Sequence, residues 1–282
     1  MILVIDVGNT HTVVGVYQYS EQDSEQDAQQ STRQNTQQAT PEDTPQNPRL
    51  IQHWRLVTES QRTSDEYGVL LSSLFAASDF SFSTVEGIIV SCVVPPMIKV
   101  VEEFTQRFFK QSPLIIGPGT KTGMPILYDV PREVGADRIV NAVAAYERYH
   151  DATIVVDFGT ATTFDYVTAN GEYLGGAIVP GIGISLEALY NKTAKLYRVE
   201  LIKPPKVVGR NTVHAIQSGI CYGYTALVDG MVDRIRKENA TQAQVISTGG
   251  FAGLIASESA TIEAVDEFLT LDGLRILYER NR

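Results

Sequence analysis

Ile2-Leu3-Val4-Ile5-Asp6-Val7-Gly8-Asn9-Thr10 lies near the start of the chain, and Ile154-Val155-Val156-Asp157-Phe158-Gly159-Thr160 repeats its pattern in the second half. Each stretch is an apolar run that ends in an aspartate, followed by a glycine and a small polar residue. A short, continuous apolar run is typical of a strand buried on both faces of a sheet. The repeat therefore predicts two similar α/β halves that face one ligand.

The turn after each strand suits phosphate. Gly8 and Gly159 permit a sharp backbone turn, and successive N–H groups in such a turn form a concavity that binds anions. Asp6 and Asp157 fit the same site because Mg²⁺ commonly lies between carboxylates and substrate phosphates. These residue types are also common in ordinary turns, but two copies after buried-type strands favour a metal and phosphate site. Side chains that could add donors are Asn9, Thr10, Thr160, Thr162 and Thr163.

Composition limits the class of protein. The 282 residues predict one large or two medium domains, and 43% hydrophobic residues allow a sizeable core. A net charge of −10 argues against a nucleic-acid-binding surface. The two cysteines, Cys92 and Cys221, have no paired spacing, so neither a disulfide framework nor a zinc site is predicted. The chain has no run of membrane-spanning length and begins with a core-type strand, so we expect a cytoplasmic protein without a membrane partner.

The order of predicted elements is mixed α/β. Residues 20–48 interrupt it with a polar stretch whose only aliphatic side chains are Ala28 and Ala39, and we interpret this stretch as a flexible surface insertion. We expect an N-terminal half at 1–120 and a C-terminal half at 121–282. Besides the repeated strands, we predict strands at 11–17, 50–57, 87–94, 114–116, 173–179, 244–247 and 268–269. We predict helices at 97–109, 136–150, 185–190, 212–237 and 271–279, and one that ends at Ala77 with Thr63 or Ser64 as its N-cap.

Gly135-Ala136-Asp137-Arg138 begins a predicted helix after Pro131. An isolated aspartate in a first helical turn is often only a favourable dipole charge. Here an arginine follows, and both the arginine and the helix N-terminus keep a carboxylate ionised, as a general base for a hydroxyl requires. Arg138 is equally suited to clamp a substrate carboxylate or phosphate, and Tyr128 could supply a wall and a hydroxyl.

Two further segments carry weaker signals. Thr248-Gly249-Gly250 follows a predicted strand, and we interpret it as a nucleoside-binding turn, although paired glycines are common in turns. Thr212 lies at the start of the longest predicted helix. It is a plausible N-cap, and the same helix start could present donors to a ligand.

Five motifs, taken together and in order, resemble the type III pantothenate kinases, members of the acetate and sugar kinase/Hsp70/actin superfamily. The resemblance covers nearly the whole chain outside Ser20–Pro48, where the family usually has a short connection. The motifs are Asp6–Thr10, Glu133–Ala142, Asp157–Thr163, Gly175–Ile178 with Pro180-Gly181, and Leu269–Leu274.

The resemblance implies a fold, an activity and its partners. The fold is α/β, with two ribonuclease-H-like (actin-like ATPase) domains facing a central cleft. The activity is ATP-dependent phosphorylation of pantothenate to 4′-phosphopantothenate, the first step of coenzyme A biosynthesis, with Mg²⁺ accompanying ATP and K⁺ or NH₄⁺ as a monovalent cation. The family is homodimeric, and its substrate pocket lies by the subunit interface.

The resemblance also implies roles for individual residues. Asp137 is the catalytic proton acceptor, Asp157 holds the monovalent cation, and Asp6 lies near Mg²⁺. The residues implied to bind ATP are Asp6, Val7, Gly8, Asn9, Thr10, His11, Thr12, Val13 and Thr160. Those implied to bind pantothenate are Tyr128, Gly135, Ala136, Asp137, Arg138 and Thr212, with Arg138 toward its carboxylate.

Two alternatives remain from the residues alone. One is another phosphotransferase, such as a sugar kinase, or a phosphatase on the same scaffold, since a fold does not fix a function. The other is a non-catalytic regulatory relative that keeps the pocket. The presence of Asp6, Asp137 and Asp157 together favours an enzyme, because a relative without chemistry has no need of all three acids.

Overall fold

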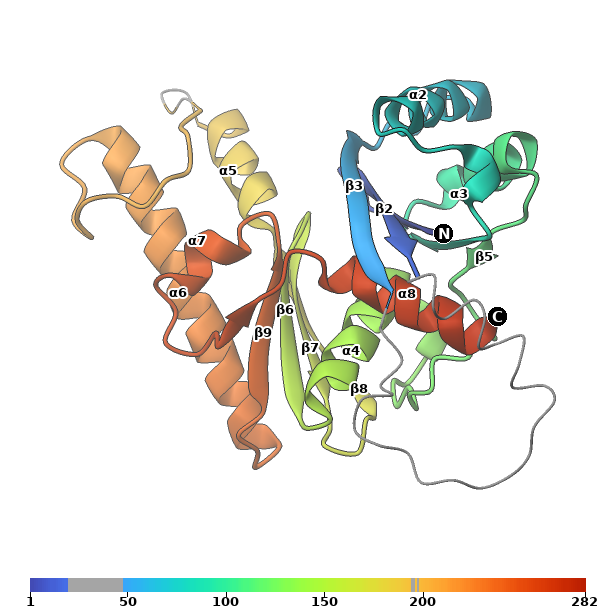
Figure 1. Ribbon diagram of the computed structural model, residues 1–282. Coiled ribbons are helices and arrows are strands. Elements are labelled where there is room, and N and C mark those ends of the chain that lie inside the picture. Colours follow the sequence, from blue (N-terminus) through green and yellow to red (C-terminus); the bar gives the residue numbers. More distant parts are fainter. Residues whose placement is uncertain (20–47, 194–195, 197) are drawn as a thin grey trace. The chain divides into compact units, whose positions relative to one another are not determined.

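The structure is a computed structural model that describes residues 1–19, 48–193, 196 and 198–282. The predicted insertion at 20–48 lies outside the described residues, apart from Pro48 at its end. The chain forms two compact units, Met1–Ile116 (unit 1) and Gly117–Arg282 (unit 2), whose elements are labelled in Figure 1.

Unit 1 is built on a five-stranded sheet in the order β3-β2-β1-β4-β5. Strands β1, β2 and β3 are antiparallel, whereas β4 and β5 run parallel to β1. The strands are β1 (Ile2–Val7), β2 (His11–Gln18), β3 (Arg49–Val57), β4 (Gly87–Cys92) and β5 (Leu114–Ile115). The helical elements are α2 (Ser64–Ala77), a 3₁₀ turn (Phe82–Thr84), α3 (Pro95–Phe104) and a π-helical turn (Thr105–Phe109).

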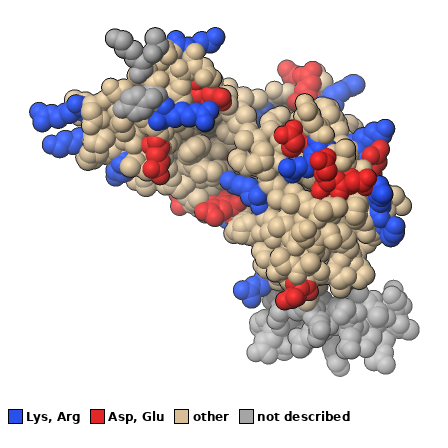
Figure 2. All heavy atoms as spheres, turned by 90° about the horizontal axis from the view of Figure 1, so that it is seen from above, with Lys and Arg blue, Asp and Glu red and all other residues tan. Residues whose placement is uncertain are grey.

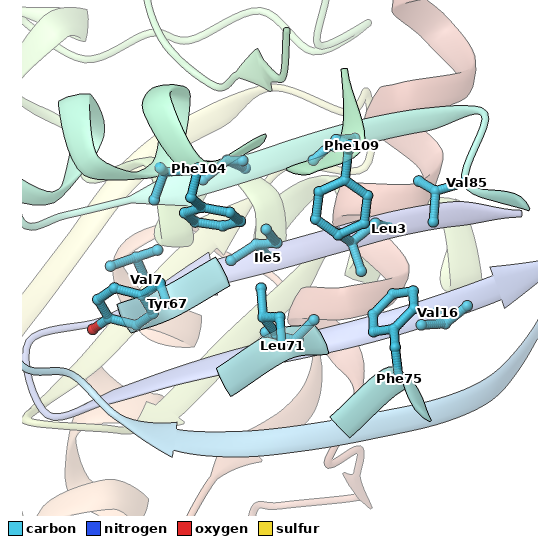
Figure 3. Packing of buried hydrophobic residues seen from close by; sticks show 14 of the residues in the cluster. Leu3, Ile5, Val7, Val16, Tyr67, Leu71, Phe75, Val85, Phe104 and Phe109 are labelled. Atoms are coloured by element: carbon cyan, nitrogen blue, oxygen red, sulfur yellow. The ribbon is translucent and has the colours of Figure 1, made fainter. Parts of the chain in front are cut away.

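The core of unit 1 lies between this sheet and its helices (Figure 3). Tyr67, Leu71 and Phe75 are at most 2% exposed, and their spacing of four residues places them on the face of α2 that meets the sheet. Of the two predicted N-caps of α2, Thr63 is the one used, because Thr63 and Glu66 form a capping box. This packing supports β1, which carries Asp6 and leads into the first turn.

Unit 2 contains a second five-stranded sheet, in the order β10-β9-β6-β7-β8. Strands β6, β7 and β8 are antiparallel, and β9 and β10 run parallel to β6, so the directions repeat those of unit 1. Asp6 and Asp157 each lie one residue before the end of the matching strand, which confirms the predicted duplication. The strands are β6 (Thr153–Phe158), β7 (Ala161–Val167), β8 (Tyr173–Pro180), β9 (Gln244–Gly249) and β10 (Ala264–Val265).

Helices cover both faces of the second sheet (Figure 1). Val155 of β6 packs on the face of α4 and α8, whereas Ile154 and Val156 pack on the face of α5, α6 and α7. Side chains alternate between the faces of a strand, and both faces of β6 are covered, which explains its continuous apolar run. The helical elements are a 3₁₀ turn (Pro131–Glu133), α4 (Ala136–Tyr149), α5 (Ile182–Asn191), α6 (Thr212–Glu238), α7 (Ala252–Ala256) and α8 (Leu269–Asn281).

Local predictions failed at three places. Strand β7 was not predicted, because its threonines were assigned to the preceding turn, although β-branched residues suit a strand. The strand predicted at 268–269 is wrong: Phe268 is the N-cap of α8, and the edge strand is β10. The helix predicted from residue 97 begins at Pro95, since proline fits a first helical position, and it ends in the π-helical turn.

Charges of both signs are interspersed on the surface shown in Figure 2, with uncharged areas between them. Ion pairs join several charged side chains of the described residues, among them Arg280 with Glu147 in unit 2. None of the described helices is both long and apolar enough to cross a membrane.

Candidate active site

Thr58, just after β3, fixes the turn between β1 and β2. Its backbone N–H donates to the Thr10 carbonyl (3.0 Å), and its Oγ1 donates to the Gly8 carbonyl (2.7 Å) and lies 2.9 Å from Thr12 Oγ1. The Gly8 N–H donates to the His11 carbonyl within the turn (3.0 Å). This N–H therefore closes the turn and is not one of the donors of the predicted anion-binding concavity.

Thr58→Val removes the hydroxyl and keeps the shape of the side chain. We expect the free energy of unfolding to fall by about 1–3 kcal/mol, because the Gly8 carbonyl and the Thr12 hydroxyl lose a partner. Urea unfolding measures the change. Thr58→Ser keeps the hydroxyl and is the matched control, and an equal loss in both variants would contradict the role of this hydroxyl.

The implied ATP-binding residues of unit 1 differ in exposure. Asp6 is half-buried at the end of β1, whereas the side chains of Val7 and Thr12 are buried in the sheet. Only the backbone of Val7 is therefore available to a ligand. The side chains exposed at the tip of the turn are Asn9, Thr10 and His11.

The turn between β6 and β7 is shorter than predicted. Gly159 and Thr160 are exposed there. Thr162 is fully buried, and Thr163 Oγ1 donates to Asp165 Oδ2 (3.1 Å). Both threonines belong to β7, so of the three candidate donors after Asp157 only Thr160 lies at this turn.

Asp157 is held by side chains from two helices that were not among the predicted site residues. Asn141 Nδ2 of α4 donates to Asp157 Oδ2 (3.2 Å), and Thr270 Oγ1 of α8 donates to Asn141 Oδ1 (2.7 Å), which fixes the amide. A Cβ on Gly249 would lie 2.7 Å from Asp157 Oδ1, and the φ of +91° at Gly249 favours glycine. Packing beside Asp157 thus requires Gly249, and its nucleoside-binding role stays a prediction.

Three carboxylates interact around Asp157. Burial, together with the charges of Asp137 and Asp165, raises the pKa of Asp157 to about 7, and the Asn141 hydrogen bond lowers it only in part. Neighbouring like charges disfavour the ionised form of each acid. The site therefore favours either a proton or a cation at Asp157.

The raised pKa of Asp157 predicts that stability depends on pH. In the unfolded chain this carboxyl titrates near its ordinary pKa of 3.8. The contribution of Asp157 to the free energy of unfolding therefore falls as the pH rises from about 4 to about 7. Asp157→Asn removes that loss. In buffers without K⁺ or Mg²⁺, we expect the variant's Tm to exceed the wild-type Tm by several degrees at pH 8, since one pKa unit corresponds to about 1.4 kcal/mol.

Calorimetry at pH 5 and pH 8 measures this effect. The Tm difference between Asp157→Asn and wild type should be much smaller at pH 5, where the folded carboxyl is largely protonated. A difference that does not widen with pH would show that Asp157 titrates normally.

The Asp137 carboxylate folds back over the first turn of α4. Its Oδ1 accepts a hydrogen bond from the Arg138 backbone N–H (2.8 Å), and a Cβ on Gly135 would lie 2.5 Å from the same oxygen. Burial raises the pKa of Asp137, and the N–H and charge of Arg138 lower it only in part. The net shift is upward, opposite to the effect expected from the neighbouring arginine alone.

Arg138 directs its guanidinium to Asp165 of β7. Nε donates to Asp165 Oδ1 (2.8 Å), and Nη2 lies 2.7 Å from the same oxygen. Tyr173 Oη also donates to Oδ1 (2.6 Å). Burial raises the pKa of Asp165, whereas Arg138, Tyr173 and Thr163 lower it. Asp165 was not among the predicted site residues, although an acid within the apolar run 164–167 is a signal for a buried, paired carboxylate.

Tyr128 lies with this cluster because its loop bonds to β8. The Tyr173 N–H donates to the Pro125 carbonyl (2.9 Å), and the Leu127 N–H donates to the Tyr173 carbonyl (2.8 Å). The Tyr128 ring packs against the backbone of Gly175. The structure therefore brings together Tyr128, Arg138 and Asp137 of the implied substrate residues.

Thr212 lies elsewhere in unit 2, in the first turn of α6. The N-cap is Asn211, whose Oδ1 accepts a hydrogen bond from the His214 N–H (2.8 Å), so the N-cap prediction for Thr212 is wrong by one residue. Thr212 helps to line a pocket of about 620 Å³. The described residues that line this pocket do not include Tyr128 or Arg138.

The donor set fits a cation held together with a nucleotide. No group of three or more His, Cys, Asp or Glu side chains converges into a metal site within the described parts of the chain. Mg²⁺ does not need such a group, because it takes one or two carboxylates and the substrate phosphates. A cation at Asp157 would relieve the repulsion from Asp137 and Asp165.

Comparison with solved structures shows the fold. A protein described as a conserved Baf family transcriptional activator, from Campylobacter jejuni, matches with a TM-score of 0.54 and 17% identity, over 99% of this chain and 98% of that chain. A protein described as a 2-dehydro-3-deoxygalactonokinase, from Sinorhizobium meliloti, matches with a TM-score of 0.53 and 11% identity, over 99% and 96%. With the two repeated sheets, these matches confirm two ribonuclease-H-like units of the actin-like ATPase and sugar kinase fold.

Comparison of sequences shows the family. The model of the type III pantothenate kinase family matches residues 2–234. A type III pantothenate kinase from Pelobacter propionicus is 53% identical over 282 residues, which covers 100% of both chains. A match over most of the chain, with this identity along its full length, leaves one conclusion: the chain belongs to the type III pantothenate kinase family.

Proposed function

We propose that this chain catalyses the ATP-dependent phosphorylation of pantothenate to 4′-phosphopantothenate, the first step of coenzyme A biosynthesis. The observation that carries this conclusion is the 53% identity, along the whole of both chains, to a type III pantothenate kinase. We assign the role of proton acceptor to Asp137, and its position next to the buried Arg138 supports this assignment. Such a site suits phosphoryl transfer, which asks a protein mainly to position reactants and stabilise charge.

In this reaction the primary hydroxyl oxygen of pantothenate bonds to the γ-phosphorus of ATP, its proton passes to Asp137, and ADP leaves. The Arg138 N–H holds one carboxylate oxygen of Asp137 (2.8 Å) and so orients the group. Because burial raises the pKa of Asp137, the carboxylate accepts a proton more readily than an exposed aspartate. The Arg138 guanidinium offers planar N–H donors for the carboxylate of pantothenate.

The cations and the nucleotide are assigned by the family resemblance. We assign Mg²⁺ to the neighbourhood of Asp6 and the monovalent cation, K⁺ or NH₄⁺, to Asp157. The acidic neighbours of Asp157 support a cation there, and bound cations supply charge neutralisation for phosphates. The ATP phosphates are assigned to residues 6–13 and Thr160, and pantothenate to Tyr128, residues 135–138 and Thr212.

We further propose a cytoplasmic homodimer. Val207 and Val208, just before α6, are 63% and 78% exposed, and burial of such side chains favours association. The pocket at Thr212 lies beside this apolar segment in the sequence, in keeping with a substrate pocket near the subunit interface. The functional halves are expected at 1–120 and 121–282, and each contains one strand with an aspartate near its end.

Purified protein with ATP, Mg²⁺ and K⁺ tests the proposed function. We expect pantothenate-dependent release of ADP, with one 4′-phosphopantothenate formed per ADP. Sugars and phosphate esters in the same assay test for another phosphotransferase or a phosphatase. Pantothenate binding without ATP turnover would identify a non-catalytic regulatory relative instead.

A further inference from the structure

Asp165 is a carboxylate that has no assigned role in the phosphorylation reaction. It is fully buried within β7, so it cannot touch a substrate. Its oxygens accept hydrogen bonds from Arg138 Nε (2.8 Å), Tyr173 Oη (2.6 Å) and Thr163 Oγ1 (3.1 Å). These three donors come from two strands and a helix, and they fix the position of the Asp165 carboxylate. The fixed carboxylate in turn holds Arg138 in place.

Asp165 determines which edge of the Arg138 guanidinium remains for a ligand. Nε and Nη2 form one edge of the planar group, and both lie within 2.8 Å of Asp165 Oδ1. Nη2 nevertheless completes no hydrogen bond with any described residue, although the side chain of Arg138 is only 9% exposed. The ion pair with Asp165 engages only the Nε side of Nη2. The second N–H of Nη2 lies along the outer edge of the planar group, next to Nη1, and a carboxylate there would supply its acceptor.

The same network reaches the loop that carries Tyr128. Tyr173 donates to Asp165 through its side chain and bonds to Pro125 and Leu127 through its backbone. The Tyr128 ring lies against Gly175, two residues further along β8. Asp165 therefore connects the arginine and the aromatic wall of the implied substrate site.

We propose that Asp165 is the positioning residue that makes this kinase selective for a substrate with a terminal carboxylate: it holds Arg138 with its outer edge toward that carboxylate and does not touch the substrate. The inference rests on the proposed function and on the assignment of Arg138 to pantothenate. It differs from a purely structural role, which would affect substrates with and without the carboxylate equally.

Asp165→Asn tests the proposal with two substrates, pantothenate and pantothenyl alcohol, in which CH₂OH replaces the carboxylate. The preference is the ratio of the two kcat/KM values. We expect the variant to lose about 10- to 100-fold of the wild-type preference, the range typical of a hydrogen bond to a charged group. The loss should be carried by KM for pantothenate, with KM for ATP unchanged. An unchanged preference would overturn the proposal.

A second variant keeps the test decisive, because removing one partner of a buried ion pair can unfold a protein. Tyr173→Phe removes only the hydroxyl that donates to Asp165 and should lower the preference by roughly 2- to 10-fold. Asp151→Asn, at an exposed residue of the same unit, is the charge-matched control and should keep the wild-type preference.

The variant Arg138→Met shows which of three assumptions is wrong if the experiment fails: the proposed function, the role of Arg138 or the role of Asp165. If wild type releases no ADP with pantothenate, the proposed function is wrong. If wild type is active but Arg138→Met keeps the full preference, Arg138 does not bind the carboxylate, and the inference fails with that assignment. If Arg138→Met loses the preference while Asp165→Asn and Tyr173→Phe keep it, only the role of Asp165 is wrong.

Discussion

Asp137→Asn should lower kcat by about 10²- to 10⁴-fold and leave KM for ATP near its wild-type value. The range is the usual contribution of a positioned general base. Asparagine can still accept the Arg138 N–H through its Oδ1, so the local structure should persist. What it cannot do is accept the proton of the attacking hydroxyl. A loss in kcat without a change in nucleotide binding is the signature of an interaction made in the transition state.

Steady-state kinetics with pantothenate-dependent ADP release measure this loss, and a thermal melt shows whether the variant is folded. Glu133→Gln is the matched control, because Glu133 is an exposed acid four residues before Asp137. The control removes the same unit of charge and should retain wild-type kcat. Near-native kcat in Asp137→Asn would remove Asp137 from the role of proton acceptor.

Asp157→Ala should abolish most of the response to K⁺. Even residues that only orient a metal ligand typically change metal affinity by about 10- to 100-fold when mutated, so we expect the K⁺ concentration for half-activation to rise at least that much. The physical reason is the position of Asp157 beside Asp137 and Asp165, where a cation offsets the repulsion that these two acids exert on the Asp157 carboxylate.

Binding of K⁺ can be measured without enzyme turnover, by thermal unfolding. A ligand that binds only the folded state raises Tm, so KCl should raise the Tm of wild type above its value in choline chloride at equal ionic strength. Asp157→Ala should lose this K⁺-specific increment, whereas Asp233→Ala, at an exposed acid on α6, should keep it. An equal K⁺ increment in Asp157→Ala would place the monovalent cation elsewhere.

The sequence predicted well the elements whose signals are local. The strands β1 and β6 were recognisable as continuous apolar runs, because the side chains on both faces of each strand are buried. The start of helix α2 could be placed to within one residue, at Thr63 or Ser64, from these capping residues and the acids after them, and the structure shows Thr63 as the N-cap. Strand β7 could not, because its threonines satisfy both a turn and a strand pattern, and only pairing with β6 decides between them.

Among the site residues, too, those with a local sequence signal were predicted and those without one were not. Asp137 and Arg138 were found from their place at a helix start, a local feature. Asp165, Thr270 and Thr58 were missed because each acts on a residue remote in sequence: Asp165 on Arg138, Thr270 on Asn141, and Thr58 on the Gly8 turn. No local periodicity encodes such a pair.

The sequence by itself determined that the chain contains two related α/β units, each with an aspartate near the end of its first buried strand. The order and polarity of neighbouring residues are enough to predict these strands and the turns that follow them, because both are local features of the sequence. Only the tertiary structure decided which partner each functional side chain has. Arg138 faces Asp165 and not its neighbour Asp137 because sheet register and helix packing bring residues 138 and 165 together, and burial then makes their pairing obligatory.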